Sequence, residues 1–329
     1  MADRETIFST HTLHPEVTKA LSELGDLVVA PEPTPAAITE GARGASIIVV
    51  RAPIPAEIFT REPKLRAAVR HGAGLDMIPM EVATEAGVLV ANVPGVNAVT
   101  VAEHVFWSSM ALLRRYPMVS SDLRNRGWAT ARAHSNHGRE ISGRTIGIIG
   151  MGHVGRQIAK IASLGFGMNV LGVTNHPGSL PNGAKLASLD EALKTADILV
   201  LCCPLNKKTR GMIGRDQLAE MKSDAILVNV ARGPVVDEQA LVEALKEERI
   251  AGAVLDVFEP QPLPQDHPYL ALPNVILTPH MAGITEESML RMGQGVVHET
   301  RAILSGQKPT NFCNPDVWGR YQERFPLKA

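Results

Sequence analysis

The sequence predicts an α/β protein of two domains, each built around a doubly wound parallel sheet. Its 329 residues are long for a single hydrophobic core. Short apolar runs alternate with amphipathic segments along the chain, which is typical of right-handed crossovers between parallel strands. A glycine-rich turn, Gly150-x-Gly152-x-x-Gly155, stands between an apolar run and a helical pattern. Together these three observations indicate the α/β class.

The first hundred residues form one of these domains in our interpretation. Apolar runs predict strands at residues 6–10, 26–30, 45–52, 65–70 and 88–93. Amphipathic segments between them predict helices at residues 15–24, 36–43, 55–61 and 78–86. No glycine-rich phosphate loop occurs among them, so we expect a small α/β domain without a nucleotide site of its own.

A longer helix is predicted at residues 101–115, and a polar stretch at residues 120–143 follows it. We expect this stretch, which carries Trp128 and several arginines and histidines, to be irregular. We interpret it as an arm that packs on a partner subunit; a solvated connection is the alternative.

The second domain opens at residue 144. We expect its strands at residues 145–149, 169–173, 197–203, 225–230, 250–256 and 274–278. Helices are expected at residues 157–164, 190–195, 216–221 and 238–248. A last helix, residues 286–304, has the length to return to the first domain.

Composition excludes several classes of partner. The formal net charge is −1 and no long basic block occurs, so we expect no nucleic acid and no anionic membrane surface. The first residues are charged, and no apolar run approaches the ~20 residues of a membrane span. Cys202, Cys203 and Cys313 suit reduced packing residues better than a disulfide or metal framework. We therefore expect a cytoplasmic protein without a metal site.

The glycine-rich turn predicts a dinucleotide site. Between a strand and a helix its glycines have separate functions: Gly150 makes the turn, Gly152 admits a pyrophosphate, and Gly155 lets the helix pack on the strand. Free N–H groups and the positive end of the helix dipole then hold the anion. A merely structural glycine-rich turn is the alternative.

Polar residues follow three late strands, at Arg232, Asp256 and His280. Ligands of doubly wound sheets lie beyond the carboxyl ends of the strands, so we expect these side chains to face the dinucleotide. An arginine can hold a carboxylate or polarise a carbonyl, and a histidine can transfer a proton near neutral pH. Exchange between an alcohol and a carbonyl needs both, because the cofactor carries only the hydride. Singly, each residue has a structural alternative: a loop ion pair, a cap or a helix start.

The chain resembles the D-isomer-specific 2-hydroxyacid dehydrogenase family over nearly its whole length. The matching motifs, in order, are Gly72-Ala-Gly-Leu-Asp76, Asn97-x-x-Thr-Val-Ala-Glu103-His, Gly150-Met-Gly-His-Val-Gly155, Asn229-Val-Ala-Arg232-Gly, Leu255-Asp-Val-Phe258 and Thr278-Pro-His280. The resemblance implies two Rossmann-like domains with the active site in the cleft between them. It implies a substrate domain of residues 1–98 and 290–329, a dinucleotide-binding domain of residues 99–289, and a homodimer paired through the latter.

The resemblance also implies residue roles. Arg232 would anchor the substrate carboxylate and carbonyl, His280 would be the acid/base, and Asp256 would orient the nicotinamide carboxamide. Backbone N–H groups of Ala73, Gly74 and Leu75 would hold the carboxylate. Further cofactor contacts are expected at Thr100, Gly150, Gly152, His153, Val154, Gly155, Cys203, Pro204, Ala231 and Gly283.

One departure from the family concerns Gln261. Relatives normally pair the catalytic histidine with a glutamate at this position, and Glu259 is no substitute, because relatives often carry glutamate there as well. We expect Gln261 to act with His280, orienting its ring without stabilising the protonated form as a carboxylate would. The segment Gln261-Pro-x-Pro-x-Asp-His267-Pro resembles the NAD-dependent formate dehydrogenases, where a Gln–His pair serves a reaction without proton transfer to substrate.

A second departure concerns the cofactor. NAD enzymes carry an acidic residue about 20 residues after the glycine motif. Here the corner reads Thr174-Asn175-His176, with neither an acid nor an arginine. These side chains could hydrogen-bond a 2′-phosphate, and Lys207 and Lys208 could lie nearby. We therefore favour NADP(H) over NAD(H).

Arg51 and Arg70 end consecutive predicted strands before the Gly72 loop. In the resembling phosphoglycerate dehydrogenases, arginines here touch the far, anionic end of the substrate; local ion pairs are an equal alternative. The expected function is an NAD(P)-dependent 2-hydroxyacid dehydrogenase working mainly as a 2-keto acid reductase, with acids that carry a second anionic group as one candidate substrate class. Formate-type oxidation and a dinucleotide-sensing protein, like the corepressors that share this fold, are the alternatives.

Overall fold

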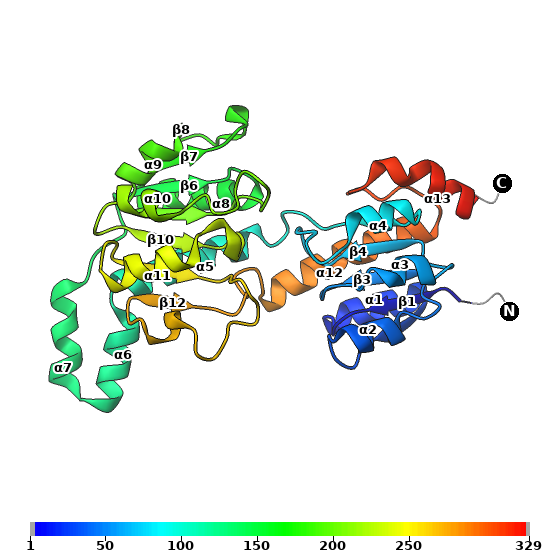
Figure 1. Ribbon diagram of the computed structural model, residues 1–329, viewed down its shortest axis with the longest axis horizontal. Helices are drawn as coiled ribbons and strands as arrows, with labels where there is room; N and C mark the ends of the chain where they lie inside the picture. The colour runs from blue at the N-terminus through cyan, green and yellow to red at the C-terminus, as the bar shows by residue number, and fades with distance from the viewer. Residues whose placement is uncertain (1–3, 327–329) are drawn as a thin grey trace. The chain divides into compact units, whose positions relative to one another are not determined.

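The structure is a computed structural model that describes residues 4–326 and divides into two compact units (Figure 1). The first unit contains the residues up to Asn97 and from Thr285 onward, and the second is Ala98–Ile284. Each unit has its own sheet of parallel strands, which confirms the predicted fold class. None of the helices formed by the described residues is long and apolar enough to cross a membrane.

The sheet of the first unit has the order β2-β1-β3-β4-β5, and its neighbouring strands are parallel. The strands are β1 Thr6–Ser9, β2 Asp26–Val29, β3 Ile47–Val50, β4 Ala67–Arg70 and β5 Leu89–Ala91. One face is covered by α1 Pro15–Leu24, α12 Glu286–Leu304 and α13 Trp318–Arg324, and the other by α2 Pro35–Gly41, α3 Glu57–Arg61 and α4 Met80–Glu85. Strand β3 is buried on both faces, which is why it reads as an uninterrupted apolar run.

Helix α12 closes this unit from the far end of the chain, as its length suggested. It packs against α1 and β4. A Cβ at Gly293 would lie 2.1 Å from Val17 Cγ2, and one at Gly295 would lie 2.4 Å from Val93 Cγ1. The two glycines therefore let α12 approach its neighbours more closely than any other residue would.

The second unit has the strand order β12-β11-β10-β9-β6-β7-β8, again parallel throughout. The strands are β6 Thr145–Ile149, β7 Asn169–Val173, β8 Ala184–Leu186, β9 Ile198–Leu201, β10 Ile226–Asn229, β11 Gly252–Leu255 and β12 Val275–Leu277. One face packs on α5 Ala98–Leu113 and α8 His153–Phe166, and the other on α9 Leu189–Thr195, α10 Arg215–Glu220 and α11 Glu238–Lys246. The strand order reverses between β6 and β9, which is where doubly wound sheets bind ligands.

The stretch at residues 120–143 is not irregular as we expected. It forms α6 Tyr116–Asn125, α7 Trp128–Ala133 and the 3-10 turn η1 His134–His137, and Figure 1 shows α6 and α7 as a helical hairpin projecting from the second unit. No residue of α6 is buried. Residues 120–143 are mostly polar and include Gly127 and Gly138, a composition typical of loops, which is why we expected no helix here.

Other differences concern short or peripheral elements. The strand β8 was not predicted, because this edge strand has no buried residue and no apolar run. Helices α5 and α8 begin three and four residues earlier than expected, and Cys202 and Cys203 lie beyond the end of β9 rather than within it. The remaining 3-10 turns are η2 Pro177–Ser179, η3 Gly233–Val235, η4 Pro268–Ala271 and η5 Pro315–Val317.

Candidate active site

The glycine turn lies between β6 and α8 and is shaped by close contacts. Gly150 has φ +104°, and a Cβ there would lie 2.8 Å from the backbone nitrogen of Cys203. A Cβ at Gly155 would lie 2.0 Å from the carbonyl oxygen of Gly150, whereas a Cβ at Gly152 would meet nothing within 4 Å. Two of the glycines are therefore required by the fold. The third borders open space at a helix N-terminus, the place where a phosphate is held.

Cys202, directly after the end of the neighbouring strand β9, supports this turn. Its thiol donates to the carbonyl oxygen of Gly150, with 3.0 Å between sulfur and oxygen. Burial raises the pKa of the Cys202 thiol, so the group stays protonated and keeps its donor. Cys202 is thus a packing residue of the glycine turn, and the cofactor contact expected at Cys203 stays a prediction.

The corner after β7 is a small polar turn. Thr174 Oγ1 accepts a hydrogen bond from the backbone N–H of His176 at 3.0 Å. Since the hydroxyl accepts there, its hydrogen is still available to an anion. Lys207 and Lys208 lie in a separate turn, in which Asn206 Oδ1 accepts from the backbone N–H of Lys208 at 2.8 Å. Whether these lysines reach the corner stays a prediction.

Arg232 follows β10 in a loop organised by the buried Asn229. Asn229 Oδ1 accepts from the backbone N–H of Ala231, and its Nδ2 donates to the carbonyl of Arg232, both at 3.0 Å. A Cβ at Gly233 would lie 2.3 Å from the carbonyl carbon of Phe258. Only glycine therefore lets the loop of Arg232 meet the loop that follows β11.

His280 and Gln261 are brought together beyond the carboxyl ends of β12 and β11, at the same edge of the sheet as Arg232. His280 Nδ1 lies 3.2 Å from Gln261 Oε1. Because an amide oxygen only accepts, the hydrogen belongs on Nδ1, which leaves Nε2 as the ring atom for proton exchange. Glu259 turns elsewhere: its carboxylate lies 3.3 Å from Arg210 Nη1. His280 has φ +54°, an uncommon conformation that is frequent at functional sites.

Asp256 is buried, whereas we expected its side chain to face the dinucleotide. Its side chain is 2% exposed, and its carboxylate accepts from the hydroxyl of Thr278 at 2.6 Å and from the backbone N–H groups of Met281 and Ala282 at 2.8 and 2.9 Å. His104 Nε2 lies 3.3 Å from the same hydroxyl, and burial lowers the pKa of His104. Asp256 thus shapes the loop that carries His280. The expected carboxamide contact stays a prediction.

Sequence reasoning missed most of this supporting network. His104, Asn229 and Thr278 stood inside recognised motifs, but nothing in the sequence gave them a role. The other expected cofactor contacts lie at Thr100 in α5, His153 and Val154 at the start of α8, Cys203 and Pro204 after β9, Ala231 after β10, Asn175 after β7, and Gly283 after β12.

The first unit brings its own predicted residues together at the ends of β3 and β4. Arg51 donates to the carbonyl of Thr12, and its Nη2 lies 3.6 Å from Met289 Sδ. Arg70 donates to the carbonyl of Gly74 in the 72–75 loop and to the carbonyls of Val50 and His71. Between them His71 is 3% exposed, and burial together with the two guanidinium groups lowers its pKa to about 3. The imidazole is therefore neutral, so the positive charge here belongs to the arginines.

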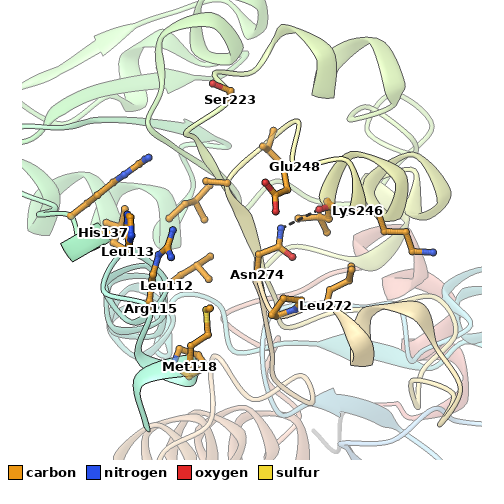
Figure 2. A pocket seen from close by; sticks show the side chains of 17 residues that line it. Leu112, Leu113, Arg115, Met118, His137, Ser223, Lys246, Glu248, Leu272 and Asn274 are labelled. Atoms are coloured by element: carbon orange, nitrogen blue, oxygen red, sulfur yellow. Dashed lines mark hydrogen bonds between the residues drawn. The ribbon is translucent and has the colours of Figure 1, made fainter. Parts of the chain in front are cut away.

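A cavity of about 510 Å³ lies at the opposite edge of the second sheet (Figure 2). Its lining includes Ile226 and Asn274, at the amino ends of β10 and β12. Figure 2 shows Arg115 and His137 on one side and Glu248 on the other. The carboxyl ends of the same strands carry Arg232 and His280, so this cavity is separate from the candidate active site.

Comparison with known proteins identifies the family. Residues 106–282 match the model of the D-isomer specific 2-hydroxyacid dehydrogenase NAD-binding domain. The chain belongs to this family. Its members are nicotinamide-dependent oxidoreductases, which confirms the expected enzyme class and the nicotinamide cofactor.

Several relatives align with most of this chain. It is 38% identical to the D-3-phosphoglycerate dehydrogenase of Methanocaldococcus jannaschii over 94% of its own length, which is 59% of that longer protein. It is 40% identical to the glyoxylate reductase of Korarchaeum cryptofilum over 80% of this chain and 81% of the relative. The NADPH-dependent glyoxylate/hydroxypyruvate reductase of Sinorhizobium meliloti, solved with NADP and malonate, has a TM-score of 0.83 at 28% identity and covers 96% of this chain and 98% of its own.

Proposed function

We propose that the protein is an NAD(P)-dependent 2-hydroxyacid dehydrogenase that works mainly as a 2-keto acid reductase. The observation that carries the proposal is the 3.2 Å contact between His280 Nδ1 and Gln261 Oε1, beyond the carboxyl ends of a sheet that also presents Arg232. A fixed imidazole and a guanidinium at the same edge of the sheet are the two groups that carbonyl reduction needs. The relatives named above support small keto acids as the substrate class.

The residues divide the reaction between them. When bound, the reduced nicotinamide supplies a hydride to the substrate C2. Arg232 holds the carboxylate and polarises the carbonyl oxygen, so that negative charge developing on this oxygen is stabilised. His280 transfers the proton from Nε2 to the same oxygen, which becomes the hydroxyl. Gln261 holds the ring through Nδ1 and leaves Nε2 directed at the substrate.

The glycine turn fits a dinucleotide. Gly152 borders open space at the N-terminus of α8, and Gly150 and Gly155 are needed for the turn itself. We propose NADP(H) as the preferred cofactor, because the corner after β7 has a hydroxyl donor at Thr174 and no carboxylate to repel a 2′-phosphate. A Thr174→Asp variant is expected to lower kcat/KM for NADPH relative to NADH by at least tenfold. An unchanged ratio would contradict the assignment.

A homodimer and a cytoplasmic location complete the proposal. The helical hairpin of α6 and α7 exposes large apolar side chains, with Trp128 73%, Tyr116 59% and Leu123 47% exposed. An arm of this kind fits a second copy of the chain as its partner. Three free cysteines fit a reducing compartment. Sedimentation is expected to give a dimer that Leu123→Glu combined with Trp128→Glu converts to a monomer; a monomeric wild type would contradict this part.

Formate oxidation is the second candidate, favoured by Gln261 alone. A neutral amide beside His280 suits a reaction that moves a hydride without a proton. The neighbouring His267 carries no such signal, because its Nε2 lies 2.9 Å from Glu238 and its Nδ1 accepts from the backbone of Tyr269, which makes it a structural cap. A sensor function without turnover, as considered from the sequence, is a third outcome of the same test.

One paired assay separates these functions. The purified protein would be supplied with NADPH or NADH against glyoxylate, hydroxypyruvate, phosphohydroxypyruvate and oxaloacetate, with formate and NAD alongside. We expect keto acids to be reduced at ordinary enzyme rates, about 1–10³ s⁻¹. Formate turnover with silence on every keto acid would overturn the proposal in favour of formate oxidation. Tight dinucleotide binding without any turnover would favour a sensor.

A further inference from the structure

The loop at residues 72–75 of the first unit is tied back through three successive carbonyl groups. The carbonyl of Gly72 accepts from the backbone N–H of Val93 at 2.9 Å. The carbonyl of Ala73 accepts from Asn92 Nδ2 at 2.8 Å, and that of Gly74 accepts from Arg70 Nε at 3.0 Å. All three donors stand at the carboxyl ends of β4 and β5. One is a main-chain group, and two are side chains.

These contacts determine where the N–H groups of the loop point. In a planar trans peptide the C=O and the following N–H point in opposite directions. Since the carbonyls of Gly72, Ala73 and Gly74 are directed at the ends of the strands, the N–H groups of Ala73, Gly74 and Leu75 are directed away from them. Within residues 4–326, none of these N–H groups donates to another residue. Successive N–H groups presented in this way form a site for an anion.

We infer that Arg70 and Asn92 are positioning residues that hold this loop in its anion-binding form. The inference rests on the proposed function, in which the anion is the carboxylate shared by all 2-keto acids. It replaces the expectation that Arg70 contacts a second, distant anionic group of the substrate. Selection by this loop is then for the carboxylate next to the reacting carbon.

The two side chains are themselves held from behind. Arg70 Nη1 donates to the carbonyls of Val50 and His71, each at 2.8 Å, so one guanidinium joins β3, β4 and the loop. The backbone N–H of Asn92 donates to the carbonyl of Asn311 at 3.3 Å. The side chain and backbone of Asn311 donate in turn to the carboxylate of Glu299, a residue that is 1% exposed. A donor anchored in this way keeps its direction when the substrate arrives.

The positive charge of Arg70 also favours an anion at the loop N–H groups, without a contact between the guanidinium and the anion. Its guanidinium donates to the loop carbonyl of Gly74 and to the carbonyls of Val50 and His71 behind the loop, and the His71 imidazole is neutral. The carbonyl dipoles are thus oriented by a fixed cation behind the loop, which makes the outward N–H groups better donors to an anion. Arginine suits this function because its planar fork serves several carbonyls at once.

The test compares substrates with one and two anionic groups. Arg70→Leu and Asn92→Leu would be assayed with glyoxylate and with oxaloacetate. We expect KM to rise by about 10- to 100-fold for both substrates alike, because the loop N–H groups lose their alignment and with it about one hydrogen bond to the carboxylate. We expect kcat to change less than threefold, since Arg232 and His280, the residues proposed to act on the carbonyl, are unchanged in these variants. Arg70→Lys and Asn92→Gln should recover part of the loss.

Control measurements separate this inference from folding and from the proposed function. Arg66→Leu is the matched control, because Arg66 lies before the other end of β4 and pairs with Glu5 at 2.7 Å; it is expected to leave both KM values within twofold. NADPH affinity and Tm report whether each variant folds. Binding of oxamate to the enzyme–NADPH complex, followed by NADPH fluorescence, needs no turnover. It therefore tests the loop even if the wild type reduces no keto acid.

Two results would overturn the inference. A rise in KM for oxaloacetate alone after Arg70→Leu would place Arg70 at the second anionic group. Unchanged KM values and unchanged oxamate affinity in well-folded Arg70→Leu and Asn92→Leu would show that neither residue shapes the site.

Discussion

The two units use side chains and main chain in opposite ways. In the second unit the groups proposed to react are the side chains of Arg232 and His280, and main-chain contacts with buried polar groups hold their loops. In the first unit the groups proposed to bind are main-chain N–H groups of Ala73 to Leu75, and side chains hold the loop. The difference follows from chemistry. A proton must be carried by a titratable side chain, whereas a carboxylate can be held by N–H groups that cannot titrate.

The largest expected effect concerns the proton carrier of the second unit. His280→Ala is expected to lower kcat for keto-acid reduction by about 10²–10⁴-fold, the usual contribution of a general acid. NADPH affinity should be nearly unchanged, because the glycine turn is untouched. Stopped-flow and steady-state assays across pH would measure this. A variant that retained a tenth of the wild-type kcat would contradict the role of His280.

The loop that carries His280 can be weakened without changing His280 itself. Asp256→Ala would leave the buried N–H of Ala282 and the hydroxyl of Thr278 without their acceptor. We expect the free energy of unfolding to fall by about 3 kcal/mol and kcat to fall as well, because the loop of His280 loses its anchor. Asp224→Ala is the matched control: this half-exposed partner of Arg139 is expected to cost less than about 1 kcal/mol. Equal losses in the two variants would argue against the network.

A buried histidine gives the first unit its own pH dependence. His71 has a pKa of about 3 in the folded protein against 6.5 in the unfolded chain. Protons therefore bind the unfolded chain preferentially between these values, and stability is lost as the pH falls from 6.5 toward 3. Between pH 6.5 and 4.5 this loss is about 2–3 kcal/mol, and His71→Leu should remove it.

Urea unfolding at a series of pH values measures this difference. His298→Leu, at an exposed histidine of the same unit whose Nε2 lies 3.1 Å from Thr310 Oγ1, is the control. The slope of stability against pH should flatten only for His71→Leu. The same slope in wild type and His71→Leu would mean that His71 is not held neutral.

The smallest expected effect concerns Gln261, which stands where relatives normally carry a glutamate. Gln261→Glu places a carboxylate against His280 Nδ1 and stabilises the protonated ring. Because reduction needs that proton, the fall of the reduction rate with rising pH should shift upward by about one pH unit. The pH dependence of kcat/KM for glyoxylate measures it. Overlapping profiles for wild type and variant would contradict the role assigned to the pair.

The sequence predicted well what depends on local pattern. The strands β6 and β7 and the helices α1 and α12 have the predicted bounds, because β-branched runs and amphipathic periods are read over a few residues. The glycine turn and the polar residues after β10, β11 and β12 were also found in this way. Each is defined by its neighbours in the chain.

Features that depend on distant residues were not predictable. Asp256 follows a strand as a ligand-facing residue would, yet its burial arises because a loop more than twenty residues later folds back over it. Arg70 and Asn92 are likewise defined by the carbonyls they meet, and Asn92 carries no local signal at all. The exposed helix α6 was missed for a different reason: it lies in a polar stretch whose composition is typical of a loop.

The most direct test of the account follows the hydride itself. Hydroxypyruvate would be reduced with NADPH carrying deuterium at the transferred position of the nicotinamide, and the product analysed by mass spectrometry and chiral chromatography. The account predicts D-glycerate with one deuterium at C2, and loss of this product in His280→Ala. Product without deuterium at C2, or no reduction under conditions where NADPH binds, would contradict the proposal that this protein is a 2-keto acid reductase.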